Sequence, residues 1–134
     1  MTAESAKTGL LLLTHGNIGR SLIEVAEFIL DQPLSDIEVL SFQQSGLVKT
    51  EDDEIGQAIG RADVGSGVLI LTDVGGASPC NYATRLQCSE QVAVVSGLNL
   101  AMLIRAWNHR HHTPRKLAEL ATEGAIRDIK ACRT

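Results

Sequence analysis

The strongest constraint on the fold is the order in which short apolar runs alternate with segments of helical periodicity. Four runs of six mostly apolar residues have the length and hydrophobicity of buried strands. They span residues 9–14, 37–42, 67–72 and 91–96. Strands separated by helices favour right-handed crossovers and hence parallel pairing. We therefore predict an α/β fold, a doubly wound open sheet of four parallel strands in the order 2-1-3-4, flanked by helices.

The helical segments are predicted from apolar spacing and from residues that favour helix ends. The first helix spans residues 18–30, and a second begins after Thr50, where acidic residues 51–54 suit a solvated first turn. Further helices are expected at residues 79–86, 99–107 and from Pro114 onward, the last carrying apolar residues as far as Ile129. With 134 residues and no linker, the chain is predicted to form one domain, residues 1–134, with residues 1–8 flexible.

Composition excludes several classes of function. The net charge is −4 and only 3% of residues are aromatic, which argues against nucleic-acid binding. Three cysteines without a CxxC pair suggest neither a disulfide framework nor a zinc site. The first residues contain neither a signal peptide nor an apolar run long enough to insert into a membrane. We expect a cytoplasmic chain.

The first strand leads into a histidine, and this makes its carboxyl end a candidate site. In doubly wound sheets, ligands bind beyond the carboxyl ends of the strands, where the strand order reverses. Here Thr14, His15, Gly16 and Asn17 precede a helix whose first N–H groups attract phosphate. A neutral imidazole is also a nucleophile at physiological pH. A histidine that merely caps the strand or closes a turn is the alternative.

The third strand places a carboxylate at the same edge of the sheet. In the order 2-1-3-4 the first and third strands are neighbours, so Asp73 is predicted to face His15. A carboxylate that binds one ring nitrogen orients the imidazole and leaves the other nitrogen free to attack phosphorus. Ser78, Thr14 and backbone N–H groups are candidate ligands of the phosphoryl oxygens. The structural alternatives are a turn residue or helix cap at Asp73 and a helix cap at Ser78.

Three segments together resemble a known family. Residues 13–16 (LTHG), residues 71–81 (LTDVGGASPCN) and residues 95–103 (VSGLNLAML) resemble the three signatures of the mannose-class enzyme IIA domain. Enzyme IIA of this class is a cytoplasmic phosphocarrier of the bacterial phosphoenolpyruvate-dependent sugar phosphotransferase system (PTS). Two departures stand out: the glycine pair comes one residue early, with Ala77 in the place of the second glycine, and Ala101 replaces a common proline.

The resemblance implies a function and partners. His15 matches the family's phosphorylated histidine, which receives phosphate from the carrier protein HPr and passes it to a IIB component. Asp73 matches the acidic partner of that histidine, and Ser78 matches the residue that touches the phosphate. The resemblance implies no metal or other cofactor, and it implies a homodimer. Some members exchange an antiparallel edge strand after the last helix, for which little chain remains before Thr134.

Other functions compete with this one. A regulatory enzyme IIA, whose phosphorylation at His15 controls partner binding without sugar transport, would have the same site residues. The phosphocarrier subunit of a dihydroxyacetone kinase shares the fold, but the Ser-Pro-Cys-Asn segment at residues 78–81 favours the PTS family.

The cluster at residues 107–112, which contains three histidines, is interpreted as a solvated helix end rather than a metal site. Arg85 and Cys80 are interpreted as a surface residue and a buried thiol.

Overall fold

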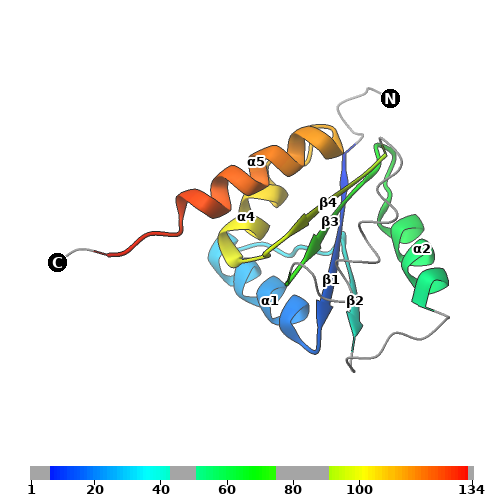
Figure 1. Cartoon of the computed structure of the whole chain (residues 1–134), viewed down its shortest axis with the longest axis horizontal. Coiled ribbons are helices and arrows are strands. Elements are labelled where there is room, and N and C mark those ends of the chain that lie inside the picture. Colours follow the sequence, from blue (N-terminus) through cyan, green and yellow to red (C-terminus); the bar gives the residue numbers. More distant parts are fainter. Residues whose placement is uncertain (1–6, 43–50, 75–90, 133–134) are drawn as a thin grey trace.

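The computed structural model describes residues 7–42, 51–74 and 91–132 of the chain. Its elements alternate strand and helix over most of that length (Figure 1). In chain order they are β1 (Gly9–His15), α1 (Ile18–Leu30), β2 (Ile37–Phe42), α2 (Glu51–Ala62), β3 (Val68–Thr72), β4 (Val92–Ser96), α4 (Leu100–Asn108) and α5 (Pro114–Arg127). The predicted helix at residues 79–86 and the proposed cap at Thr50 lie outside the described residues.

The four strands form one parallel sheet in the order β2-β1-β3-β4, which confirms the predicted topology. The register places His15 opposite Phe42 on β2, and Leu13 opposite Thr72 on β3. Consequently β1, which was predicted to end at Thr14, extends one residue further. The carboxyl ends of β1, β2 and β3 therefore meet at one edge of the sheet.

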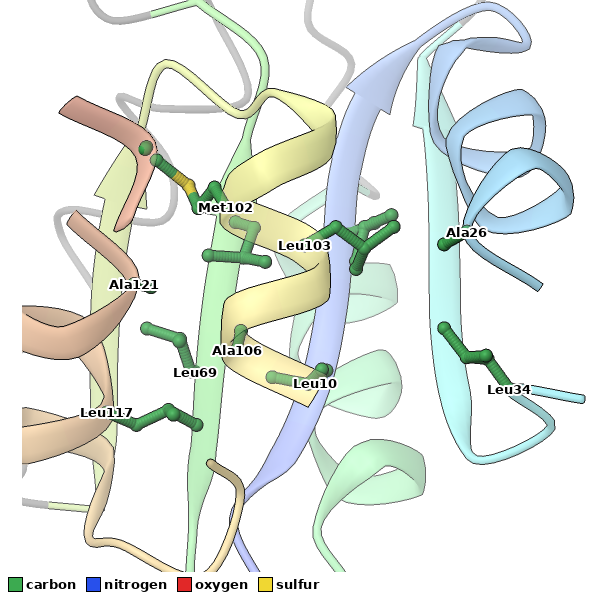
Figure 2. Close-up of a cluster of buried hydrophobic side chains, with 12 residues drawn as sticks. Leu10, Ala26, Leu34, Leu69, Met102, Leu103, Ala106, Leu117 and Ala121 are labelled. Atoms are coloured by element: carbon green, nitrogen blue, oxygen red, sulfur yellow. The ribbon is translucent and has the colours of Figure 1, made fainter. Parts of the chain in front are cut away.

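Helices pack on both faces of the sheet (Figure 1). Alternate residues of the central strands supply two separate cores, because successive strand side chains point to opposite faces. Leu10, Leu12, Leu69 and Leu71 form one core with α1, α4 and α5, and Figure 2 shows Met102, Leu103 and Ala106 of α4 in this cluster. The second core lies on the α2 side, where Ile55 and Ala58 of α2 pack against Leu11 and Leu13 of β1 and against Val68 and Ile70 of β3. The doubly wound arrangement thus buries the central strands β1 and β3 from both sides.

The last helix begins where the sequence predicted. Pro114 lies in its first turn, and the hydroxyl of Thr113 accepts a hydrogen bond from the N–H of Lys116, so the start is capped. The helix ends at Arg127, however, and Ile129 lies beyond it with 71% of its surface exposed. No helix in the described ranges has the length and apolarity needed to span a bilayer.

The histidine cluster lies at the other end of the sheet and is more packed than predicted. After α4 ends, the guanidinium carbon of Arg110 lies 3.3 Å from the centre of the Trp107 ring, and burial lowers the pKa of Arg110. The carbonyl oxygens of Arg110 and His112 accept hydrogen bonds from the N–H and hydroxyl of Thr8. Thr8, expected in a flexible leader, is therefore part of the folded domain, and the helix end is not simply solvated.

Candidate functional site

The ends of β1 and β3 bring together His15 and Asp73, the pair predicted from the sequence. Nδ1 of the His15 ring lies 3.1 Å from Oδ2 and 3.3 Å from Oδ1 of Asp73. The two residues are 58 positions apart in the chain, so the parallel pairing of β1 with β3 is what makes them neighbours. The predicted contact across the switch point of the sheet is present.

Backbone N–H groups hold the Asp73 carboxylate in place. The N–H of His15 donates to Oδ2 over 2.9 Å, and the N–H of Val74 donates to Oδ1 over 3.0 Å. The side chain of Asp73 is only 6% exposed, whereas that of His15 is 35% exposed. A carboxylate fixed in this way can accept a hydrogen bond from Nδ1–H and hold one tautomer of the imidazole. Nε2 is then the ring nitrogen with a free electron pair.

The turn after His15 depends on Gly16. Its φ of 52° lies in the left-handed region, which glycine adopts without steric cost. The N–H of Gly16 donates to the carbonyl oxygen of Phe42, so this amide already has a partner. Gly16 contributes the shape of the turn, and the first turn of α1 follows directly.

Phe42 is a site residue that sequence reasoning missed. The register puts it beside His15, and the two rings lie 6.4 Å apart, centre to centre, at an angle of 48°. With 7% exposure, the phenyl ring is an apolar neighbour of the imidazole. The sequence did predict that the second strand ends at Phe42. It could not predict the register that aligns Phe42 with His15.

Asn17 and the first turn of α1 supply polar groups beside the histidine. Asn17 is the N-cap residue of α1, is exposed, and makes no capping hydrogen bond through its side chain. The first backbone N–H groups of any helix lack an intrahelical acceptor and carry a partial positive charge. This end of α1 therefore suits an anion held next to His15.

Thr14 lies beneath the site rather than beside the imidazole. It is fully buried, and consecutive strand residues point to opposite faces, so its hydroxyl is on the α1 side of the sheet. A Cβ at Gly19 would lie 2.8 Å from that hydroxyl oxygen. Neither this oxygen nor the hydroxyl of Thr72 has a hydrogen-bond partner among the residues described. Ser78, the remaining predicted ligand of the phosphoryl oxygens, lies outside them.

The described residues do not gather a metal-binding group. No set of three or more His, Cys, Asp or Glu side chains converges among them, including at the cluster of His109, His111 and His112. Those rings lie 4.4–6.2 Å apart, centre to centre. What the described residues bring to the sheet edge is an imidazole, a carboxylate and a helix N-terminus.

The fold and the site together define the class of protein: a doubly wound parallel sheet with an imidazole and a carboxylate in contact at its switch point, followed by a helix N-terminus that suits an anion. The sequence comparison identifies the family within that class. Residues 9–121 match the EIIA-man family, described as the PTS system fructose IIA component. The chain belongs to this family.

Individual relatives agree with this assignment. The PTS system mannose-specific EIIAB component of Escherichia coli (strain K12) is 29% identical over 121 residues, which is 88% of this chain and 37% of that protein. The chain thus spans little more than a third of the length of this curated relative. Among solved structures, the mannose/sorbose specific IIA subunit from Enterococcus faecalis is 27% identical with a TM-score of 0.82, covering 96% of both chains. A PTS IIA protein associated with the fucose utilization operon of Streptococcus pneumoniae shares the fold, with 21% identity, a TM-score of 0.78 and 93% coverage of both chains.

Proposed function

We propose that this chain is a phosphohistidine carrier of sugar uptake, which accepts a phosphoryl group from phospho-HPr on Nε2 of His15 and passes it to a IIB component. The observation that carries the proposal is the contact of 3.1 Å between Nδ1 of His15 and the buried Asp73 carboxylate. Membership of the EIIA-man family supports the PTS role and the mannose class. The cytoplasm is the compartment in which these partners would meet the chain.

The proposed step is a transfer between two nitrogen atoms. The electron pair on Nε2 of His15 attacks the phosphorus of the donor's phosphohistidine, a new N–P bond forms, and the donor's N–P bond breaks. Nδ1 keeps its proton and donates a hydrogen bond through it to the Asp73 carboxylate, which stabilises the positive charge that develops on the imidazole. In the second transfer the IIB nucleophile attacks the same phosphorus and His15 leaves as a neutral imidazole.

The groups that bind the phosphoryl oxygens belong to the same proposal. Asn17 and the first N–H groups of α1 follow His15 within a few residues of the chain and suit a negative charge. Ser78 is proposed as a further ligand on the resemblance alone. Thr14 and Gly16 shape the site, since the Thr14 hydroxyl is buried and the Gly16 amide is bonded to Phe42.

A reconstituted phosphorylation assay tests the function. The chain is incubated with phosphoenolpyruvate, enzyme I and HPr, and the expected product is an acid-labile, alkali-stable phosphate that is absent from His15→Ala. NMR of the ¹⁵N-labelled histidine ring should place the phosphorus on Nε2. Persistence of the label in His15→Ala, or phosphorus on Nδ1, would contradict the assignment.

Onward transfer distinguishes transport from regulation. A purified IIB component of the mannose class should remove the label from His15 and become phosphorylated itself. If His15 is phosphorylated but IIB components of this class accept nothing, the regulatory alternative becomes the better description. That outcome would support phosphorylation of His15 but would argue against its role in sugar transport.

A further inference from the structure

A hollow whose lining does not include His15 lies between α4 and α5. It has a volume of about 590 Å³ and is bounded by residues from both ends of α4, from the end of α5 and from the tail that follows α5. Figure 1 shows α4 and α5 packed side by side on one face of the sheet. A volume of this size is typical of small-molecule sites.

Arg105 of α4 is held in a fixed position at the wall of this hollow. Its Nε–H donates to the carbonyl oxygen of Leu120 over 3.2 Å. Its aliphatic stem packs against Gly124, where an added Cβ would lie 2.9 Å from both Cγ and Cδ. The absence of a side chain at Gly124 therefore makes room for the arginine. A guanidinium restrained by its stem and by Nε loses little entropy when its terminal nitrogens bind an anion.

The hollow concentrates positive charge in an acidic chain. Arg105, Arg127 and Lys130 line it, with Asp128 as the one carboxylate among its lining residues. In the described part of the chain, none of these three cations lies within ion-pair distance of a carboxylate. The pKa of His109, which also lines the hollow, is lowered, first by burial and then by the charge of Arg105.

We propose that this hollow is a binding site for a small polyanion that carries phosphate or carboxylate groups. The restrained Arg105 would bind two oxygens of one anionic group through its terminal nitrogens, as guanidinium groups do. Arg127 and Lys130 would neutralise further charge at the rim. This site does not include His15 and does not rest on the phosphocarrier function.

NMR titration with inorganic pyrophosphate tests the proposal, using the amide of Gly124 and the Nε–H of Arg105 as reporters. Both resonances should shift saturably. The variants Arg127→Gln and Lys130→Gln should each weaken binding by roughly three- to tenfold, because each removes one charge from an exposed position. A parallel titration with citrate distinguishes phosphate from carboxylate as the preferred group.

Arg115→Gln is the matched control, because it removes the same charge from the opposite end of α5. It should leave the titration unchanged within about twofold, since a distant exposed charge is screened. Shifts that rise linearly without saturation, or an equal loss of affinity in Arg115→Gln, would overturn the proposal. Tighter binding of a hexaglutamate peptide through the same reporters would also overturn it, in favour of docking by an acidic protein segment. None of these outcomes depends on whether His15 can be phosphorylated, so the two proposals can fail separately.

Discussion

Asp73 binds both the imidazole of His15 and the backbone of the strand that carries it. One of its oxygens accepts hydrogen bonds from the backbone N–H and the ring Nδ1 of His15, and the other accepts from Val74. Any rotation of the carboxylate would therefore disturb the backbone at the end of β1 as well as the imidazole. This explains why an aspartate, with its short side chain, suits the position.

Replacing Asp73 with Asn tests the role of the carboxylate. The amide keeps the size of the side chain, but it removes the negative charge proposed to stabilise the imidazolium-like state, and its NH2 group replaces one of the two oxygens that accept hydrogen bonds. We expect phosphoryl transfer from HPr to slow by roughly 10- to 100-fold while the circular dichroism spectrum is retained. Rapid-quench measurement of single-turnover transfer provides the test.

Asp63→Asn is a matched control for that substitution. The Asp63 carboxylate also accepts two backbone hydrogen bonds, from Gly65 and Gly67, but it lies at the start of β3 rather than at its end. Its replacement should leave the transfer rate unchanged. Both of those hydrogen bonds go to Oδ1, which an asparagine keeps, so the control removes a carboxylate charge and leaves the turn intact. If both variants slowed transfer equally, loss of negative charge in general would explain the effect and the pairing with His15 would not.

His109 gives the stability of the fold a dependence on pH. Burial, and then the charges of Arg105, His112 and His111, lower its pKa from the ordinary value of 6.5. The unfolded chain consequently binds a proton at this position more readily than the folded chain. The stability that neutral His109 contributes to the folded chain is fully present above about pH 6.5. It is lost as the pH falls toward the lower pKa that His109 has in the folded chain.

Comparison of His109→Gln with the parent chain isolates this contribution. Urea midpoints measured between about pH 7.5 and pH 5 should fall more steeply in the parent, because only the parent can protonate position 109 on unfolding. Titrating groups that do not interact with His109 are common to both proteins and cancel in the difference. Parallel midpoint curves would show that His109 is not protonated more readily in the unfolded chain.

At the scale of elements, the approach of α1 to the sheet is set by a glycine. Gly19 is buried, and a Cβ there would lie 2.8 Å from the Thr14 hydroxyl and 3.2 Å from Cγ1 of Val39. The first turn of α1 can therefore lie close to β1 and β2 only without a side chain at this position. That first turn also carries the N–H groups proposed to face the phosphate.

Gly19→Ala should destabilise the fold, whereas Gly56→Ala should stabilise it. An alanine at position 19 must displace α1 or the Thr14 side chain, at a cost of about 1–3 kcal/mol. Gly56 is exposed in α2, where an added Cβ meets nothing within 4 Å, so the better helix former should add about 0.5–1 kcal/mol. Urea unfolding of both variants measures the difference, and a destabilised Gly56→Ala would contradict this account of packing.

The elements show how far the sequence could predict the structure. Continuous apolar runs indicated β1 and β3, because both are buried on two faces, and a doubly wound order places their ends together. The register could not be predicted, because it depends on how all the side chains pack. For that reason Phe42 was missed. The alternation along β1 places the hydroxyl of Thr14, predicted as a phosphate ligand, in a buried position on the α1 side of the sheet.

At the scale of the whole molecule, the folded chain leaves considerable apolar surface uncovered. Eight large hydrophobic side chains are exposed among the described residues, and four of them lie on α1: Ile18, Val25, Phe28 and Ile29. Phe28 is 86% exposed. Apolar surface gathered on one helix is unusual for a soluble monomer and is common where proteins associate. This supports the homodimer implied by the family resemblance.

We therefore expect the chain to sediment as a dimer, with twice the mass of 14.3 kDa, in equilibrium ultracentrifugation. Association driven by apolar burial should persist at about 0.5 M NaCl, because salt screens charges without weakening the hydrophobic effect. Each chain also carries a net charge of −4, so two copies repel each other at low salt and the dimer should tighten as salt is added. If the measured mass were that of a single chain across the accessible concentration range, the homodimer would be excluded. If a dimer formed but dissociated in salt, charge pairs rather than the apolar surface would hold it together.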